Sequence, residues 1–118
     1  MPQDRSFHDY VIHDLFRGIP GITSRAMFGG WGIYQDGAIF AIIVDGELYF
    51  KVDERSRPAF ERLGSHPFVY TQGDHKPTVM PYWLLPMDVM EDEEELREWV
   101  EAAVRASRNI ARRNASAK

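Results

Sequence analysis

The stretch SRAMFGGWGIYQDGAIFAIIVDGELYFKVD, residues 24–53, decides the fold of this chain. It contains two Asp-Gly pairs, Asp36-Gly37 and Asp45-Gly46, and this dipeptide is among the strongest short-range signals for a β-hairpin turn. An unbroken apolar run, residues 38–44, lies between the two turns, and an alternating segment follows the second turn. We therefore predict an antiparallel meander whose central strand, residues 38–44, is covered on both faces.

Two further strands are predicted after the meander, over residues 67–71 and 78–85, joined across Gly73-Asp74. Pro81 cannot donate a hydrogen bond to a neighbouring strand. It therefore places the last strand at an edge of the sheet or introduces a bulge there.

Helical patterns surround these strands. Residues 6–17 predict an N-terminal helix, residues 54–63 a short middle helix, and Asp92 caps a long C-terminal helix. The order predicts an α+β fold, in which an antiparallel meander sheet of about five strands is flanked by these three helices.

The composition fits a single domain, residues 1–118. The chain has no cysteine, which excludes disulfides, thiolate metal sites and thiol nucleophiles. Its longest apolar run is far shorter than the roughly 20 residues of a membrane helix, and its first residues lack the apolar run of a secretory signal. We therefore expect a soluble, cytoplasmic protein that does not contact membranes.

The glycine-rich segment MFGGWG, residues 27–32, raises the question of a phosphate-binding loop. Such a loop connects a strand to a helix, so that free amides and the helix dipole meet the anion. Here the glycines lead into another strand. We therefore predict that they permit a bend in the sheet, at a place where a side chain would clash.

An alternative keeps the same bend as part of a small-anion or metabolite site. We place Arg25 and Lys51 on neighbouring strands of the meander, and two cations near a glycine bend could bind a carboxylate or phosphate. The competing interpretation is a structural salt bridge to Asp53 or Glu47. The candidate ligand-binding residues are Arg25, Gly29, Gly30 and Lys51, with Tyr82 and Trp83 as aromatic residues that could stack on a planar ligand.

No residues form a recognisable catalytic or metal site. The four histidines, at positions 8, 13, 66 and 75, lack metal-binding spacings, and no Gly-x-Ser-x-Gly nucleophile motif occurs. We predict neither an enzyme nor a cofactor.

The C-terminal end is basic although the chain carries a net charge of −4. Arg105, Arg108 and Arg112 fall within about 60° around a helix and make a stripe. They either contact nucleic acid or simply suit the negative end of the helix dipole. We expect residues 105–118 to be a basic and partly frayed tail.

Several blocks are specific when taken in order. They are R-x-M-F-G-G-x-G-x-Y, ELYFKVD, PFVY and YWLLP, and they supply Arg25, Met27, Phe28, Gly29, Gly30, Gly32, Tyr34, Phe40, Ala41, Leu48, Tyr49, Lys51, Asp53, Phe68, Tyr70, Tyr82, Trp83, Leu85 and Pro86. From about residue 8 to residue 106, this series resembles the amino-terminal domain of the TfoX/Sxy family, which is linked to bacterial natural competence.

The resemblance implies an α+β domain with a curved antiparallel sheet and a non-enzymatic regulatory role. Full-length competence regulators carry a second, carboxy-terminal helical domain, and we expect this chain to be a stand-alone amino-terminal domain. We expect a protein partner, with the transcription machinery as one such partner. A homodimer is one way to cover the second face of the central strand.

Overall fold

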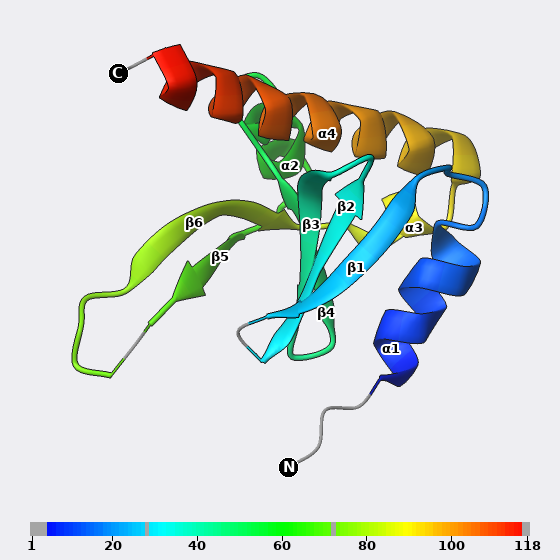
Figure 1. Cartoon of the computed structure of the whole chain (residues 1–118), viewed down its shortest axis with the longest axis horizontal. Coiled ribbons are helices and arrows are strands. Elements are labelled where there is room, and N and C mark those ends of the chain that lie inside the picture. Colours follow the sequence, from blue (N-terminus) through cyan, green and yellow to red (C-terminus); the bar gives the residue numbers. More distant parts are fainter. Residues whose placement is uncertain (1–4, 28, 72, 117–118) are drawn as a thin grey trace.

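A computed structural model describes residues 5–27, 29–71 and 73–116 of the chain (Figure 1). The elements are α1 Ser6–Asp9, the π-helical η1 Tyr10–Leu15, β1 Ile22–Met27, β2 Gly30–Gln35, β3 Ala38–Val44, β4 Glu47–Lys51, α2 Arg57–Arg62, β5 Pro67–Tyr70, β6 Thr78–Leu84, α3 Met87–Met90 and α4 Glu93–Ser116. The predicted α+β class is confirmed. The sheet has six strands, because the segment before the first Asp-Gly pair forms a hairpin of its own, β1–β2.

The sheet is antiparallel throughout, in the order β1-β2-β3-β4-β6-β5. Both Asp-Gly pairs form the predicted hairpin turns, with positive φ at each position: 49° and 86° at Asp36 and Gly37, 52° and 73° at Asp45 and Gly46. These values are those of type I′ turns, whose twist matches that of the strands. The central meander is therefore confirmed.

Pro81 lies at a bulge and not at an edge, because β6 is flanked by β4 and β5. Pro67 pairs with Trp83 and Val69 pairs with Val79, so two steps along β5 correspond to four along β6. The extra residues let β6 accommodate a residue that lacks an N–H. The carbonyl of Pro81 still accepts a hydrogen bond from the amide of Val52, at 2.9 Å.

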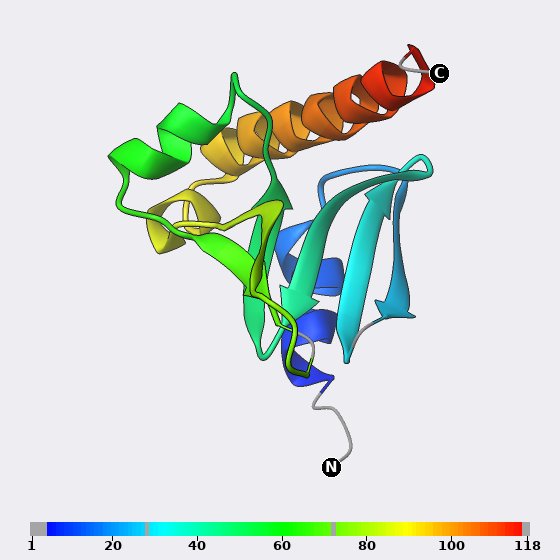
Figure 2. The ribbon, with the colours of Figure 1, turned by 90° about the vertical axis from the view of Figure 1, so that its left-hand side faces the viewer.

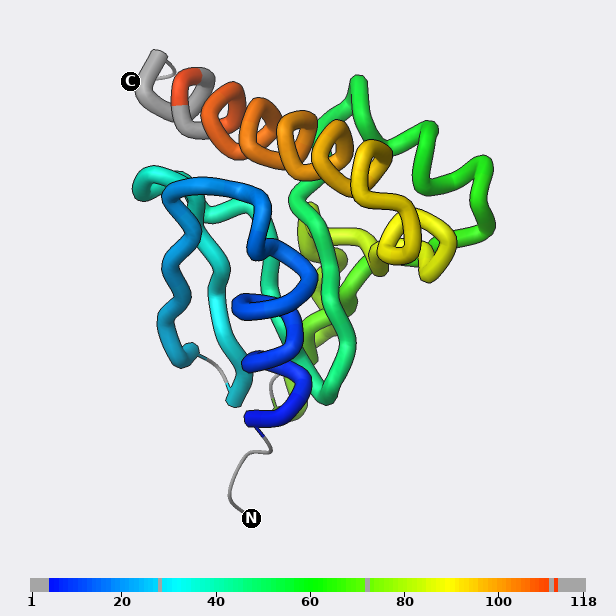
Figure 3. The backbone as a smooth tube through the Cα atoms, turned by 90° about the vertical axis from the view of Figure 1, so that its right-hand side faces the viewer, coloured from blue at the N-terminus to red at the C-terminus, as the bar shows by residue number. Residues whose placement is uncertain are grey.

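One face of the sheet packs against α1, η1, α2, α3 and α4 to form the main core. Its buried residues are Val11, Phe16, Ile33, Phe40, Ala41, Ile43, Leu48, Phe50, Val52, Phe60, Leu85, Val89, Leu96, Val100, Ala103 and Val104. Figure 3 shows α1 in front of the sheet and α4 running across its end. The rings of Phe16, Phe40 and Phe50 meet at the centre, with centroids 5.6 to 6.2 Å apart.

β3 sends apolar side chains to both faces, as predicted. Its residues Ile39 and Ala41 pair with Tyr34 and Ile33, which leaves Phe40 without a counterpart on β2. This bulge turns both Phe40 and Ala41 into the main core. The opposite face carries a second-face cluster, built from strand residues alone: Ile39, Ile42, Val44, Tyr49, Phe68, Met80, Tyr82 and Leu84.

The second face is partly covered by the chain itself. Strands β5 and β6, which we call the arm, turn away from the plane of the first four strands (Figures 1 and 2). Phe68 and Met80 of the arm pack on the second-face cluster. The sheet is thus curved, and its own hairpin covers part of the face for which a homodimer is one expected cover.

The long helix α4 begins as predicted. The Asp92 carboxylate accepts hydrogen bonds from the backbone N–H groups of Glu94 and Glu95, both at 3.1 Å. The helix continues to Ser116 and so includes most of residues 105–118, which we expected to be a partly frayed tail. Residues 117–118 lie outside the described residues, as does Phe28 of the glycine-rich segment.

Candidate functional site

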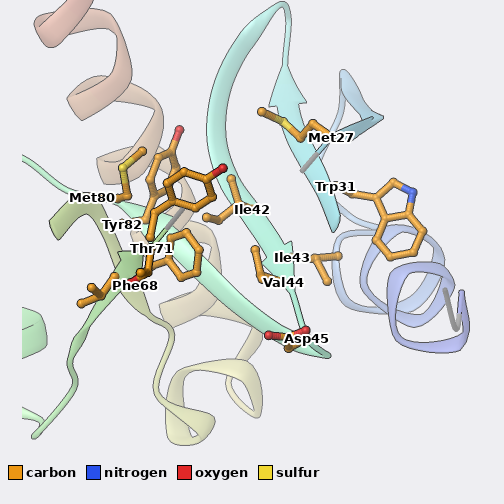
Figure 4. A pocket seen from close by; sticks show the side chains of 12 residues that line it. Met27, Trp31, Ile42, Ile43, Val44, Asp45, Phe68, Thr71, Met80 and Tyr82 are labelled. Atoms are coloured by element: carbon orange, nitrogen blue, oxygen red, sulfur yellow. The ribbon is translucent and has the colours of Figure 1, made fainter. Parts of the chain in front are cut away.

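A cavity of about 460 Å³ lies between the arm and the second face of the sheet (Figure 4). We call it the arm cavity. It is lined by Met27, Trp31, Ile42, Ile43, Val44, Asp45, Phe68, Val69, Tyr70, Thr71, Met80 and Tyr82. Side chains of β3 face those of the arm across it (Figure 4), and its volume lies within the range of small-molecule sites.

The strand period explains which side chains enter the cavity. Ile42 and Val44 alternate with Ile43 on β3, and Ile43 belongs to the main core. On the arm, Phe68 and Met80 face inward while their neighbours Val69 and Val79 are exposed. The cavity is therefore a direct result of the alternation of these strands and of the curvature that brings them together.

The glycine-rich segment introduced above, which we call the glycine block, shapes the first hairpin. Met27 pairs with Gly30, and Gly29 has a φ of 74°, so the chain reverses between β1 and β2. A Cβ at Gly30 would lie 1.9 Å from the carbonyl oxygen of Ile43, because the backbone of β3 passes directly over it. A Cβ at Gly32 would lie 2.6 Å from the sulfur of Met27. The block leads from strand to strand, so its glycines serve close packing and the predicted bend.

Arg25 and Lys51 are not brought together. They lie on β1 and β4, with β2 and β3 between them, a separation of roughly 14 Å at the usual strand spacing. The guanidinium of Arg25 lies over the ring of Tyr34, 5.9 Å from its centroid, and Lys51 Nζ lies 5.1 Å from that of Tyr82. Our assumption of neighbouring strands was wrong, and neither cation lines the arm cavity.

The two carboxylates predicted as salt-bridge partners accept other hydrogen bonds. Glu47 accepts a hydrogen bond from the hydroxyl of Tyr49 at 3.3 Å, and the Asp53 carboxylate accepts from the backbone amides of Arg55 and Ser56 at 3.0 Å. Burial lowers the pKa of the Lys51 ammonium. Lys51 is thus a partly desolvated cation that rests on an aromatic ring.

Tyr82 and Trp83 point to opposite faces of the sheet. Tyr82 lines the arm cavity, where burial, with a smaller contribution from Tyr34, raises its pKa to about 12. Trp83 packs against the main core. Among the predicted ligand-binding residues, Tyr82 is the one that lines the cavity.

The arginines of the predicted stripe, Arg105, Arg108 and Arg112, are exposed on α4. The helix buries its other side, formed by Val100, Val104 and their neighbours, in the main core. The stripe is therefore accessible to a partner, and nucleic-acid contact there stays a prediction.

Three side chains, those of His8, Asp9 and Ser24, connect the first helix to the edge strand β1. No sequence motif predicted this trio. The Ser24 hydroxyl donates to His8 Nε2 at 2.8 Å, and His8 Nδ1 donates to the Asp9 carboxylate at 2.9 Å in the neutral tautomer that this arrangement favours. His8 is buried, and its ring lies 4.7 Å from that of Trp31. Both ring nitrogens are satisfied, which is what a buried histidine requires.

This trio predicts a pH-dependent contribution to stability. The hydrogen bond from His8 is the largest factor that lowers the pKa of Asp9. A lowered pKa in the folded state stabilises the protein above the unfolded value, and this contribution is lost as the pH falls through the folded value. We expect Asp9→Asn to be less stable than the wild type at neutral pH, with a gap that closes below about pH 4. Urea unfolding at several pH values measures this, and a gap independent of pH would contradict it.

Two kinds of feature are absent from the part of the chain that the structure describes. Within those residues no three His, Asp or Glu side chains gather as a metal-binding group. No helix among them combines the length and apolarity needed to cross a membrane.

Two comparisons with known proteins gave matches. The family model described as the TfoX N-terminal domain matches residues 14–107. The DNA transformation protein TfoX1 of Aliivibrio fischeri is 34% identical over 50 residues, which cover 42% of this chain and 24% of that protein. The match thus spans about a quarter of the relative's length. Because the family model covers most of the chain, the chain belongs to the TfoX N-terminal domain family.

Proposed function

We propose that the chain is a non-catalytic regulatory domain that acts in the cytoplasm through protein contacts, in the control of transcription or competence. Family membership supports this proposal, together with the similarity to a protein named for DNA transformation. The partner would be a protein of the transcription machinery.

The observation that carries the proposal is an exposed apolar pair on the arm. Val69 and Val79 are directly paired across β5 and β6, and they are 45% and 65% exposed. β5 is also an edge strand. An open edge beside apolar side chains is the geometry by which a partner adds a strand to a sheet.

The test is a double substitution on this surface, Val69→Thr with Val79→Lys, which keeps the strands and removes the apolar pair. In the native host, deletion of the gene is expected to change the transcript levels of a defined gene set. The wild-type chain should restore them and the double variant should not. Thr23→Lys, an exposed position on the opposite edge strand β1, is the matched control and should restore them fully. Unchanged transcript levels on deletion would contradict the proposal.

The trio of Ser24, His8 and Asp9 has the residue types of a serine hydrolase, yet its surroundings favour a structural role. The Asp9 side chain is 53% exposed, so water screens its effect on His8. Ser24 lies within a regular strand, and not at the strand-to-helix turn that supplies oxyanion donors in α/β-hydrolases.

We accordingly expect a fluorophosphonate probe to leave the protein unlabelled, as measured by intact mass. An adduct at Ser24 that disappears in Ser24→Ala would show an activated serine and overturn the non-catalytic assignment. Trypsin in the same reaction verifies that the probe is active.

A further inference from the structure

The arm cavity has a chemical character that selects a class of ligand. The side chains that meet inside it are Met27, Ile42, Val44, Phe68, Met80 and Tyr82. Thioethers and aromatic rings are polarisable and pack well on a flat aromatic ligand. A volume of about 460 Å³ accommodates one or two fused rings with a short substituent.

The charge that lines the cavity is negative and lies at one end of it. Asp45 is the charged residue among those that line it, and it lies at the turn between β3 and β4. Its carboxylate forms no ion pair with another described residue. Glu47 is close by, and both carboxylates help to raise the pKa of the Tyr49 hydroxyl, after the larger effect of burial. This end of the cavity therefore carries a negative potential, which repels anions and attracts cations.

We propose that the arm cavity binds a small aromatic amine, with its ring between Phe68, Tyr82 and Ile42 and its ammonium group toward Asp45. The apolar walls account for most of the affinity, and the carboxylate determines the sign of the charge that is accepted. This inference differs from anion binding at Arg25 and Lys51, since neither lines the cavity. The ligand would lie inside the arm cavity, which Val69 lines in part, and the inference does not depend on the regulatory function proposed above.

Three probes that share one ring system test the proposal: 1-naphthylmethylamine, 1-naphthalenemethanol and 1-naphthoic acid. Each is titrated into the full chain and followed by calorimetry and by amide chemical shifts. We expect the amine to bind about threefold more tightly than the alcohol and about tenfold more tightly than the acid, as befits a carboxylate near solvent. The largest shifts should fall on β3, β5 and β6.

The two Asp-Gly turns supply a matched pair of variants. Asp45→Asn should remove the preference for the amine over the alcohol, whereas Asp36→Asn, at the equivalent position of the other turn, should retain it. Phe68→Ala should weaken the binding of all three probes. Should Phe68→Ala fail to fold by circular dichroism, Met80→Ala and the wild-type shift map take its place.

Three outcomes would overturn the proposal. Absence of binding by all three probes would show that the cavity is closed to ligands of this size. Equal affinity for acid and amine would show a site without charge selection, of the kind that takes an apolar side chain of a protein partner. Shifts confined to other surfaces would show binding elsewhere.

Discussion

Gly30→Ala is expected to lower the free energy of unfolding by about 3 kcal/mol or more, a large part of the stability of a domain this size. The added methyl group would lie 1.9 Å from the carbonyl oxygen of Ile43, and this oxygen belongs to the backbone of the central strand. A flexible side chain could move aside, but the strand cannot do so without breaking its pairing with β2 or β4. Urea unfolding of the purified variant measures the loss.

Gly18→Ala is the control for this experiment. A Cβ at Gly18 would have its nearest neighbour at 3.7 Å, an ordinary contact with the flexible end of Arg97. Its stability should stay within about 0.5 kcal/mol of the wild type. If Gly30→Ala were equally mild, the close approach of β2 and β3 at this residue would be refuted.

Phe40→Ala is expected to cost about 3–5 kcal/mol, the usual range for removing a buried phenylalanine. The ring is fully buried and meets those of Phe16 and Phe50 at 5.6 and 5.7 Å. Phe40 also occupies the bulge of β3, between Ile39 and Ala41, which both pair with β2, so the surrounding backbone collapses poorly into a cavity. Thermal and urea unfolding should both report the loss.

Tyr10→Ala provides the aromatic control, because Tyr10 is 43% exposed on the first helical segment. Its substitution should cost about 1 kcal/mol or less. Equal losses at the two positions would show that the phenylalanine cluster is not the centre of the core.

The local features of the fold were predictable because single residues specify them. Aspartate and glycine tolerate the positive φ of both turns, and Asp92 supplies the cap of α4. The curvature of the sheet was not predictable in this way. It follows from bulges at Phe40 and near Pro81, which depend on how distant strands pair.

Prediction of the candidate site from the sequence was limited for the same reason, since it also depends on how distant strands pair. Arg25 and Lys51 seemed close because the meander was drawn without its strand order, and two intervening strands separate them. The arm cavity and the bond between His8 and Ser24 join segments that are far apart in sequence, and no spacing rule connects them. Tyr82 was found because an aromatic strand residue was considered for stacking on a ligand.

Strand β3 contributes side chains both to the arm cavity and to the main core. The stability of the cavity is therefore coupled to the unfolding of the whole domain. Ile42 contacts the cavity while its neighbour Ile43 is anchored in the main core, so neither layer can melt while the other keeps its strand. A molecule held under the arm would therefore raise the unfolding temperature of the entire domain through thermodynamic linkage. The hairpin and the helical layer should accordingly unfold in one transition.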